Sequence, residues 1–339
     1  MKSHKFVALA SAVLAFCGLA RTASAQSVED FYRGKTVTIM IGYGPGGTDD
    51  VWARLLAKYM PEHIPGKPTV VASNVPGAGS LLLTNQIYNT QPKDGTVIGL
   101  INRGVPFEPL LGGVGTRFDP MKFNYIGSPD RDTPACAVRM DAPINSVPEL
   151  LTKELIVGAT GSGADSQVYP EVLNAMLGVK MKIVQGYPGS RDILLAMERG
   201  EVQGGCVSYD TIVRDAMYRE KRSRLLFQAA LKPDDRMPEV PMITDLAKTD
   251  DQKKALELFL QRTLVGRPFV MGPGVPAERV EAIRKAFLAA LRDPGLAADS
   301  RIAGVNTHYV SPAELTRIIA ESYAAPAAVV ATVKKALGR

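Results

Sequence analysis

The chain of 339 residues is 46% hydrophobic and 22% charged, and its formal net charge is +6 at pH 7. This length exceeds that of one ordinary domain, so we expect two lobes. The mild basic surplus comes without basic runs interleaved with aromatic residues, which argues against a nucleic-acid partner. Three histidines and three cysteines without ligand spacing indicate no metal site, and no cofactor is expected.

Residues 1–25 have the pattern of an export signal. Two lysines precede an apolar core at 6–19, and residues 23–25, Ala-Ser-Ala, match a cleavage site. We therefore predict a signal peptide that is cleaved after Ala25 and a mature protein in the periplasm. The leader holds three cations and no acidic residue, so the mature chain keeps a net charge of +3.

The first hundred residues alternate between apolar runs and glycine-rich turns. Strands are predicted at 37–41, 69–72 and 96–101, and helices at 51–60 and 81–88. Strand, turn and helix in repeated order are typical of a parallel sheet covered by helices.

A second set of alternations follows a polar, turn-prone stretch at 129–134, which we expect to cross between the lobes. One further strand is predicted before this stretch, at 124–127; beyond it, strands are predicted at 135–140, 155–160, 180–185, 202–208 and 225–231, with helices at 167–177 and ending at 199. The polar stretch at 248–254 is expected to be the return connector. Lobe 1 is therefore predicted to hold residues 26–131 and 251–339, and lobe 2 residues 132–250. No pattern in the residues after 254 indicates a catalytic or ligand-binding site.

Four turns each follow a predicted strand and precede a predicted helix, at 46–50, 74–80, 161–166 and 187–191. In an open α/β sheet such turns gather at the carboxyl ends of the strands, where ligands bind. The free N–H groups of helix starts suit carboxylate oxygens. The glycines could instead serve tight turns only, but four such turns on a two-lobed plan favour a cleft. The candidate ligand-binding residues are Tyr43, Gly46, Gly47, Thr48, Asp49, Asp50, Asn74, Gly77, Ala78, Gly79, Ser80, Gly161, Ser162, Gly163, Ala164, Asp165, Ser166, Tyr187, Pro188, Gly189 and Asp210.

The adjacent carboxylates Asp49 and Asp50 open a predicted helix. One is expected to be the helix N-cap, and the other to reach a ligand hydroxyl or ammonium. Arg54 either pairs with an aspartate one turn earlier or lies on the surface. Asp165 and Asp210 either reach the cleft from the second lobe or serve as cap and turn residues.

An alternative interpretation is an exported dinucleotide-dependent enzyme, because Gly42, Gly44 and Gly47 spell G-x-G-x-x-G after a strand. That fingerprint needs an acidic residue after the next strand, which here ends at Ser73 and Asn74. No nucleophile elbow, P-loop or zinc-protease motif occurs, so we predict no catalytic residue and no enzyme.

Two cysteines remain after the leader, Cys136 and Cys206. In an oxidising compartment they could form a disulfide, but sequence cannot show that they are close. The question stays open at this point.

Three short motifs resemble those of the receptors of tripartite tricarboxylate transporters, known as the Bug family. Pro45-Gly46-Gly47, Asp50 and Ala53-Arg54 resemble the family's P-G-G-x-x-D-x-x-A-R opening, residues 74–79 its N-R-P-G-A-G segment, and Asp94-Gly95-Thr96 its D-G-y-T. The resemblance is densest over 37–99. Val75 replaces an arginine of that pattern, and Ser80 and Leu83 replace glycines.

The resemblance implies a two-lobed type II periplasmic binding fold of the α/β class. Each lobe would be a mixed, mostly parallel sheet flanked by helices, with the ligand cleft between the lobes. It implies a monomer that binds a di-, tri- or aromatic carboxylate, with Asp50 as a candidate contact for the distal group. It also implies delivery to a permease of one large and one small membrane subunit. A binding protein that serves a membrane sensor is the remaining alternative.

Overall fold

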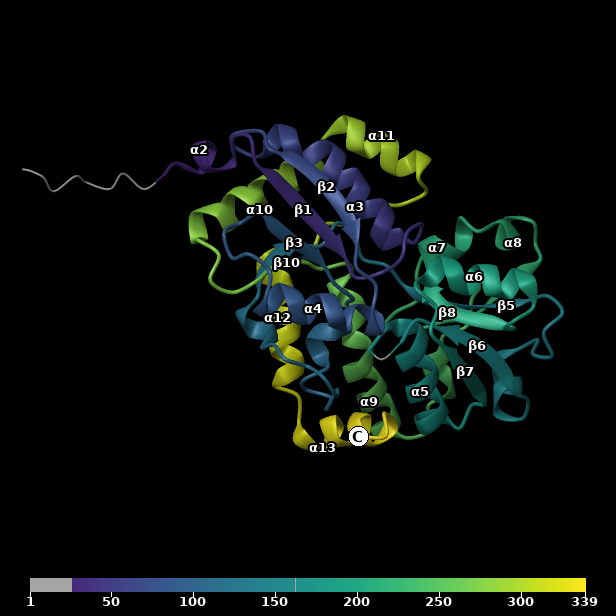
Figure 1. Ribbon diagram of the computed structural model, residues 1–339. Coiled ribbons are helices and arrows are strands. Elements are labelled where there is room, and N and C mark those ends of the chain that lie inside the picture. Colours follow the sequence, from purple (N-terminus) through teal and green to yellow (C-terminus); the bar gives the residue numbers. More distant parts are fainter. Residues whose placement is uncertain (1–25, 162) are drawn as a thin grey trace, which may run out of the picture.

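Two five-stranded sheets, each flanked by helices, organise the chain (Figure 1). This computed structural model describes residues 26–161 and 163–339, so the predicted signal peptide and Ser162 lie outside the described residues. Each sheet is mixed and mostly parallel, as the sequence predicts.

The first sheet has the strand order β2-β1-β3-β10-β4. Its strands are β1 (Thr36–Ile41), β2 (Thr69–Asn74), β3 (Val97–Leu100), β4 (Asn124–Gly127) and β10 (Phe269–Met271). β1 pairs in parallel with β2 and β3, whereas β10 runs antiparallel between β3 and β4. Its helices are α2 (Val28–Tyr32), α3 (Thr48–Tyr59), α4 (Leu81–Asn89), α10 (Ala277–Leu291), α11 (Pro294–Ile302) and α12 (Pro312–Tyr323).

The second sheet repeats this plan in the order β7-β6-β8-β5-β9. Its strands are β5 (Pro134–Arg139), β6 (Leu155–Ala159), β7 (Met181–Gln185), β8 (Gly204–Ser208) and β9 (Ser223–Gln228). β6 is parallel to β7 and β8, and β5 is antiparallel to β8 and β9. The helices α5 (Asp165–Leu177), α6 (Ser190–Arg199), α7 (Tyr209–Val213) and α8 (Ala216–Arg219) belong to this half.

The chain passes from the first sheet to the second between β4 and β5, and it returns between β9 and β10. The stretch at 248–254 lies inside this return segment. Thr249 and Gln252 form a capping box that starts helix α9 (Asp250–Leu260), so these polar residues are a helix start. α9 packs with α5 and the last helix, α13 (Ala327–Ala336), below the two sheets (Figure 1).

Short 3₁₀ helices complete the connections: η1 (Met60–His63), η2 (Ala78–Ser80), η3 (Val105–Phe107), η4 (Pro120–Lys122), η5 (Val147–Leu151), η6 (Ile243–Leu246) and η7 (Gln261–Val265). The apolar faces of the strands and helices form large buried clusters. Trp52 of α3 is fully buried in the cluster under the first sheet. Tyr169 of α5 packs edge-on against Phe259 of α9, with ring centroids 5.1 Å apart. This contact ties the return segment to the second half.

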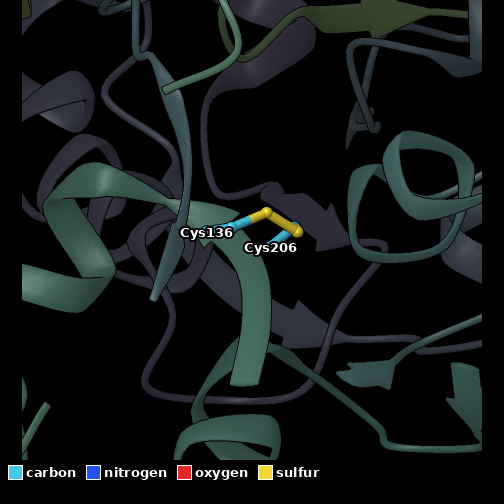
Figure 2. The surroundings of a disulfide bond; sticks show 2 residues. All are labelled: Cys136 and Cys206. Carbon is cyan, nitrogen blue, oxygen red and sulfur yellow. A yellow bond between two sulfur atoms is a disulfide. The ribbon is translucent and has the colours of Figure 1, made fainter. Parts of the chain in front are cut away.

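Cys136 of β5 and Cys206 of β8 are cross-strand partners and form a disulfide (Figure 2). Both residues are buried in the middle of the second sheet. The structure thus answers the question that the sequence left open. The bond links two antiparallel strands that are 70 residues apart in the chain.

Candidate functional site

The four predicted turns meet where the carboxyl ends of the parallel strands of the two sheets face each other. The N–H group of Gly44 donates a hydrogen bond of 3.1 Å to the carbonyl oxygen of Pro188 in the other half. A Cβ on Gly161 would lie 3.4 Å from Cα of Ala78 across the same boundary. Because backbone approaches backbone so closely, the two halves are closed against each other at these turns.

Two adjacent cavities lie between the halves. The inner cavity, of about 30 Å³, is lined mostly by polar side chains, including Asp49, Arg103 and Asp165. The outer cavity, of about 360 Å³, is lined by residues of the second and fourth turns. Tyr43 and Thr160 line both, so the two cavities are neighbours along one cleft.

Asp50 organises the first turn from within the first half. Its Oδ2 accepts hydrogen bonds from the N–H of Gly46 and Nε of Arg54, each of 3.0 Å, and its Oδ1 accepts one from Nδ2 of Asn74. Burial works to raise the pKa of Asp50, but the hydrogen bonds from Arg54, Gly46 and Asn74 hold it below its usual value. The prediction that an aspartate is the helix N-cap is wrong, since the N-cap is Gly47 and no side chain caps it.

Asp49, in contrast, lines the inner cavity. Within the described chain its carboxylate has no hydrogen bond, and its nearest cation is Nε of Arg267 at 3.8 Å. Burial raises the pKa of Asp49 above its usual value, against the opposing effect of Arg267 and Arg103. The two adjacent aspartates therefore have different environments, one bonded within the turn and one facing the cavity.

The second turn has an unusual backbone. Ala78, Gly79 and Ser80 all have positive φ angles of 46°, 60° and 78°. Ser80, which stands where the family pattern has glycine, is fully buried, and its Oγ accepts a hydrogen bond of 3.1 Å from the N–H of Asn102. Within the described chain no hydrogen bond occupies the N–H groups of Ala78 and Gly79, which line the outer cavity.

The second half contributes the starts of α5 and α6. The N–H of Thr160 donates a hydrogen bond of 3.0 Å to Oγ of Ser166, which orients this turn beside the inner cavity. Asp165 is the first residue of α5, and its Oδ2 pairs with Nε of Arg103 from the first half at 2.9 Å. Tyr187 lines the outer cavity.

The structure places the predicted site residues in three groups. The inner cavity is lined by Tyr43, Asp49, Asp165 and Ser166. The outer cavity is lined by Tyr43, Gly77, Ala78, Gly79, Tyr187 and Pro188. The residues that line neither cavity are Gly46, Gly47, Thr48, Asp50, Asn74, Ser80, Gly161, Gly163, Ala164, Gly189 and Asp210. The prediction for Ser162 falls outside the described residues.

One of the residues outside the cavities, Thr48, still connects the halves. Oγ1 of Thr48 lies 2.7 Å from Oγ1 of Thr211 and accepts a hydrogen bond of 2.8 Å from Nη2 of Arg214. Asp210 is buried and pairs within the second half, with Nη1 of Arg236 at 2.7 Å. Burial raises the pKa of Asp210 to about 7.

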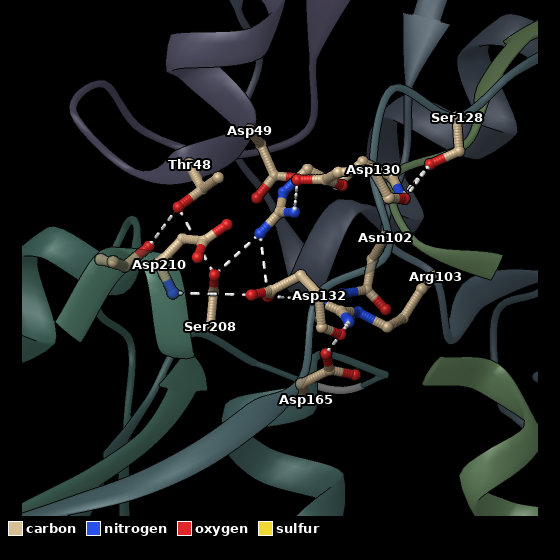
Figure 3. A network of polar contacts seen from close by, with 12 residues as sticks. Thr48, Asp49, Asn102, Arg103, Ser128, Asp130, Asp132, Asp165, Ser208 and Asp210 are labelled. Atoms are coloured by element: carbon tan, nitrogen blue, oxygen red, sulfur yellow. Dashed lines mark hydrogen bonds and ion pairs between the residues drawn. The ribbon is translucent and has the colours of Figure 1, made fainter. Parts of the chain in front are cut away.

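A buried network of arginines and aspartates, which sequence reasoning missed, lies beside the inner cavity (Figure 3). Arg267 contacts Asp130 through Nη1 and Asp132 through Nη2, the latter at 2.9 Å. Arg103 also contacts Asp132, at 3.1 Å, and reaches Asp165 with Nε. Nε1 of Trp52 donates a further hydrogen bond of 2.7 Å to Asp130. The sequence signals for this network were Asp165, already a candidate, and the pair of aspartates within the predicted crossing; the two arginines carried no signal.

Replacing Asp50 by alanine should disturb the first turn as a whole. The change removes the acceptor for Gly46, Arg54 and Asn74, and a lost buried hydrogen-bond partner costs about 1–3 kcal/mol. We expect the free energy of unfolding to fall by about that amount, measured by urea unfolding at pH 7. Because the folded-state pKa of Asp50 is lowered, its contribution is present above about pH 4 and is lost as the pH falls further. An unchanged unfolding midpoint would contradict this role.

Among the described residues, no cluster of three or more His, Cys, Asp or Glu side chains is placed to hold a metal ion. Nor do the described residues form a helix that is both long and apolar enough to cross a bilayer.

Comparison with known proteins gives a consistent result. The model of the tripartite tricarboxylate transporter family receptor matches residues 52–334. The UPF0065 protein in gbd 5'region of Cupriavidus necator is 28% identical over 254 residues, which cover 73% of this chain and 75% of that protein.

Two solved structures share the fold. The periplasmic binding protein BugD resembles this chain with a TM-score of 0.70 at 22% identity, covering 90% of this chain and 98% of its own. MatC (Rpa3494) from Rhodopseudomonas palustris with bound malate has a TM-score of 0.71 at 20% identity, and the match covers 88% of this chain and 99% of MatC. The predicted two-lobed periplasmic binding fold is thereby confirmed. Because the family model spans most of its length, the chain belongs to the tripartite tricarboxylate transporter receptor family.

Proposed function

We propose that the protein is a periplasmic receptor that captures a small carboxylate between its two halves and delivers it to a membrane permease of one large and one small subunit. The observation that carries this proposal is the pair of adjacent cavities at the carboxyl ends of both sets of parallel strands. The outer cavity has a volume typical of small-molecule sites. MatC, which has the same fold, binds malate.

The carboxylate is expected to bind at the second turn. Ala78 and Gly79 line the outer cavity just before α4, where the helix dipole adds positive potential, and we expect their N–H groups to receive the carboxylate. Tyr187 and Pro188 of the other half face them. A ligand held there contacts both halves, so binding favours the closed arrangement over an open one.

Closure is proposed to be a hinge motion of lobe 1 (26–131 and 251–339) against lobe 2 (132–250) about the two crossings. The closed state is supported by contacts between the halves, such as the hydrogen bond from Gly44 to Pro188 and the ion pair of Arg103 with Asp165. We also propose export with cleavage after Ala25, a monomeric state and the absence of catalysis.

The glycines of the dinucleotide-like pattern have other roles here. A Cβ on Gly42 would collide with the side chain of Ser80, and one on Gly44 would lie 3.4 Å from Cβ of Pro188. Close packing between turns therefore accounts for both glycines without a nucleotide.

A thermal-shift screen tests the proposal. The mature protein, stripped of copurified ligand by unfolding and refolding, is incubated with millimolar malate, succinate, citrate, benzoate or amino acids, and separately with NAD. A ligand present at a hundred times its Kd adds about 2.7 kcal/mol to the free energy of unfolding, so a micromolar binder raises the Tm clearly. We expect a shift with at least one carboxylate and none with NAD. A shift with NAD alone would overturn the receptor proposal.

A further inference from the structure

Carboxylates outnumber the cations that they contact around the inner cavity. Arg267 contacts Asp49, Asp130 and Asp132, and Arg103 contacts Asp132 and Asp165 (Figure 3). Two guanidinium groups thus serve four carboxylates, which leaves a formal surplus of two negative charges. A buried charge is costly unless an opposite charge compensates it.

The carboxylates with the fewest compensating contacts are those of the two aspartates that line the cavity. Asp165 is 8% exposed, and its Oδ1 is buried without a hydrogen-bond partner in the described chain, while Oδ2 pairs with Arg103. Asp49 has only the contact of 3.8 Å with Arg267, whose Nε is itself without a hydrogen bond there. These carboxylates come from opposite halves, Asp49 from α3 and Asp165 from α5.

Other charged groups nearby do not pair with these two carboxylates. The guanidinium of Arg262 lies 4.2 Å from the ring centroid of Phe259, and within the described chain its Nη atoms have no hydrogen-bond partner. Arg214 donates to Thr48 and to the carbonyl oxygen of Asp210. Arg262 and Arg103 draw the pKa of Asp165 down, yet burial raises it above its usual value. Within the described chain, Asp49 and Asp165 therefore have no cation in contact with them other than Arg267 and Arg103.

We propose that the inner cavity binds the ammonium group of an amino-bearing carboxylate, between Asp49 and Asp165, while the carboxylate of the same ligand binds at Ala78 and Gly79 in the outer cavity. An ammonium carries three donors and no acceptor, which matches the carboxylate of Asp49 and Oδ1 of Asp165, neither of which has a hydrogen bond within the described chain. The inner cavity, at about 30 Å³, admits a group of this size, and Tyr43 lies between it and the larger outer cavity. The inference rests on the proposed receptor function and narrows its ligand to amino acids.

Matched pairs of ligands test this inference by isothermal titration calorimetry on stripped mature protein. The pairs are aspartate and succinate, glutamate and glutarate, and phenylalanine and 3-phenylpropionate, whose members differ by one amino group. We expect the amino member of the best-binding pair to bind on the order of thirtyfold or more tightly, the scale of a buried charge pair.

Two variants test whether the ammonium group of the ligand binds between Asp49 and Asp165. Asp49→Asn and Asp165→Asn keep the size of the side chain and remove its charge, and each should remove most of the amino preference within that pair. Asp251→Asn, an exposed change at the start of α9, is the matched control and should leave both affinities unchanged. Asp49 is partly exposed, so its variant is expected to fold, which circular dichroism checks.

The outcomes separate this inference from the proposed function. If the unsubstituted acid of every pair binds as tightly as its amino partner, the ammonium site is overturned while the carboxylate receptor stands. If the amino preference survives both aspartate variants, the placement between Asp49 and Asp165 is wrong. If no member of any pair binds while another carboxylate of the thermal-shift screen does, the ammonium site is overturned and the receptor stands; if the screen is silent as well, both proposals fail.

Discussion

Replacing Arg267 by methionine should lower the free energy of unfolding by about 3–5 kcal/mol at pH 7, the usual cost of removing one partner from a buried ion pair. Arg267 is 1% exposed and contacts the carboxylates of Asp130 and Asp132, which are equally buried. Methionine keeps much of the apolar stem but provides no donor. In the variant, the carboxylates of Asp130 and Asp132 stay buried but lose the positive charge of the Arg267 guanidinium.

Acid should reduce the difference between this variant and the wild type. In the wild type, burial works to raise the pKa of Asp132, but Arg267 and Arg103 hold it below its usual value. Such a group stabilises the fold above about pH 4 and loses this effect as the pH falls. Without Arg267 burial prevails and the folded-state pKa rises, so the variant is penalised at high pH and recovers as the pH is lowered.

Urea unfolding at pH 7 and pH 5 measures both effects. Arg317→Met is the matched control, because Arg317 pairs with Glu321 at 2.7 Å on the surface of α12. The side chains of Arg317 and Glu321 are both more than half exposed, so we expect the free energy of unfolding to change by at most about 0.5 kcal/mol. Adding Asp130→Asn to Arg267→Met should recover part of the loss, since it removes one unpaired charge. Equal effects of the two arginine changes would contradict the structural role of Arg267.

The strands and turns were predictable because they follow from local pattern. The apolar run at 37–41 corresponds to β1 (Thr36–Ile41), and the glycines after it mark the turn. The helix that follows begins three residues earlier than the expected 51, because Gly47 already has an extended backbone and serves as N-cap. The return stretch at 248–254 also holds the start of a helix that was not predicted, although its Thr249-x-x-Gln252 spacing is itself a helix-start signal.

The ionic network could not be predicted in the same way. Arg103 follows β3, Asp132 precedes β5 and Arg267 precedes β10, so these groups meet only because the chain crosses twice between the sheets. No spacing along the sequence encodes that meeting. The same reason explains why Asp49 and Asp50 could not be told apart: their separate environments depend on Asn74 and on Arg267, which are brought in by other strands.

Removing the disulfide should cost about 4 kcal/mol of the free energy of unfolding, according to the chain-entropy model for a loop of this length. Cys136 and Cys206 close a segment of 70 residues, and without the bond the unfolded chain gains the conformations that this closure forbids. The folded state should keep its strand pairing, since Cys136 and Cys206 are held by ladders on both sides, so the loss lies mainly in the unfolded ensemble.

The double variant Cys136→Ala/Cys206→Ala, compared with the wild type by urea unfolding, measures this cost. The mature chain proposed here has no other cysteine, so the variant also serves as the control for reductant. Reductant should shift the unfolding midpoint of the wild type toward that of the variant and leave the variant itself unchanged. A wild-type midpoint that does not respond to reductant under unfolding conditions would contradict the disulfide.

A bond that holds β5 to β8 also fixes a strand that borders the inner cavity, because Cys206 and Ser208 of β8 both line that cavity. Ligand affinity measured in the same variant therefore reports whether the second half presents Asp165 and Ser208 in the same geometry once the cross-strand tie is removed.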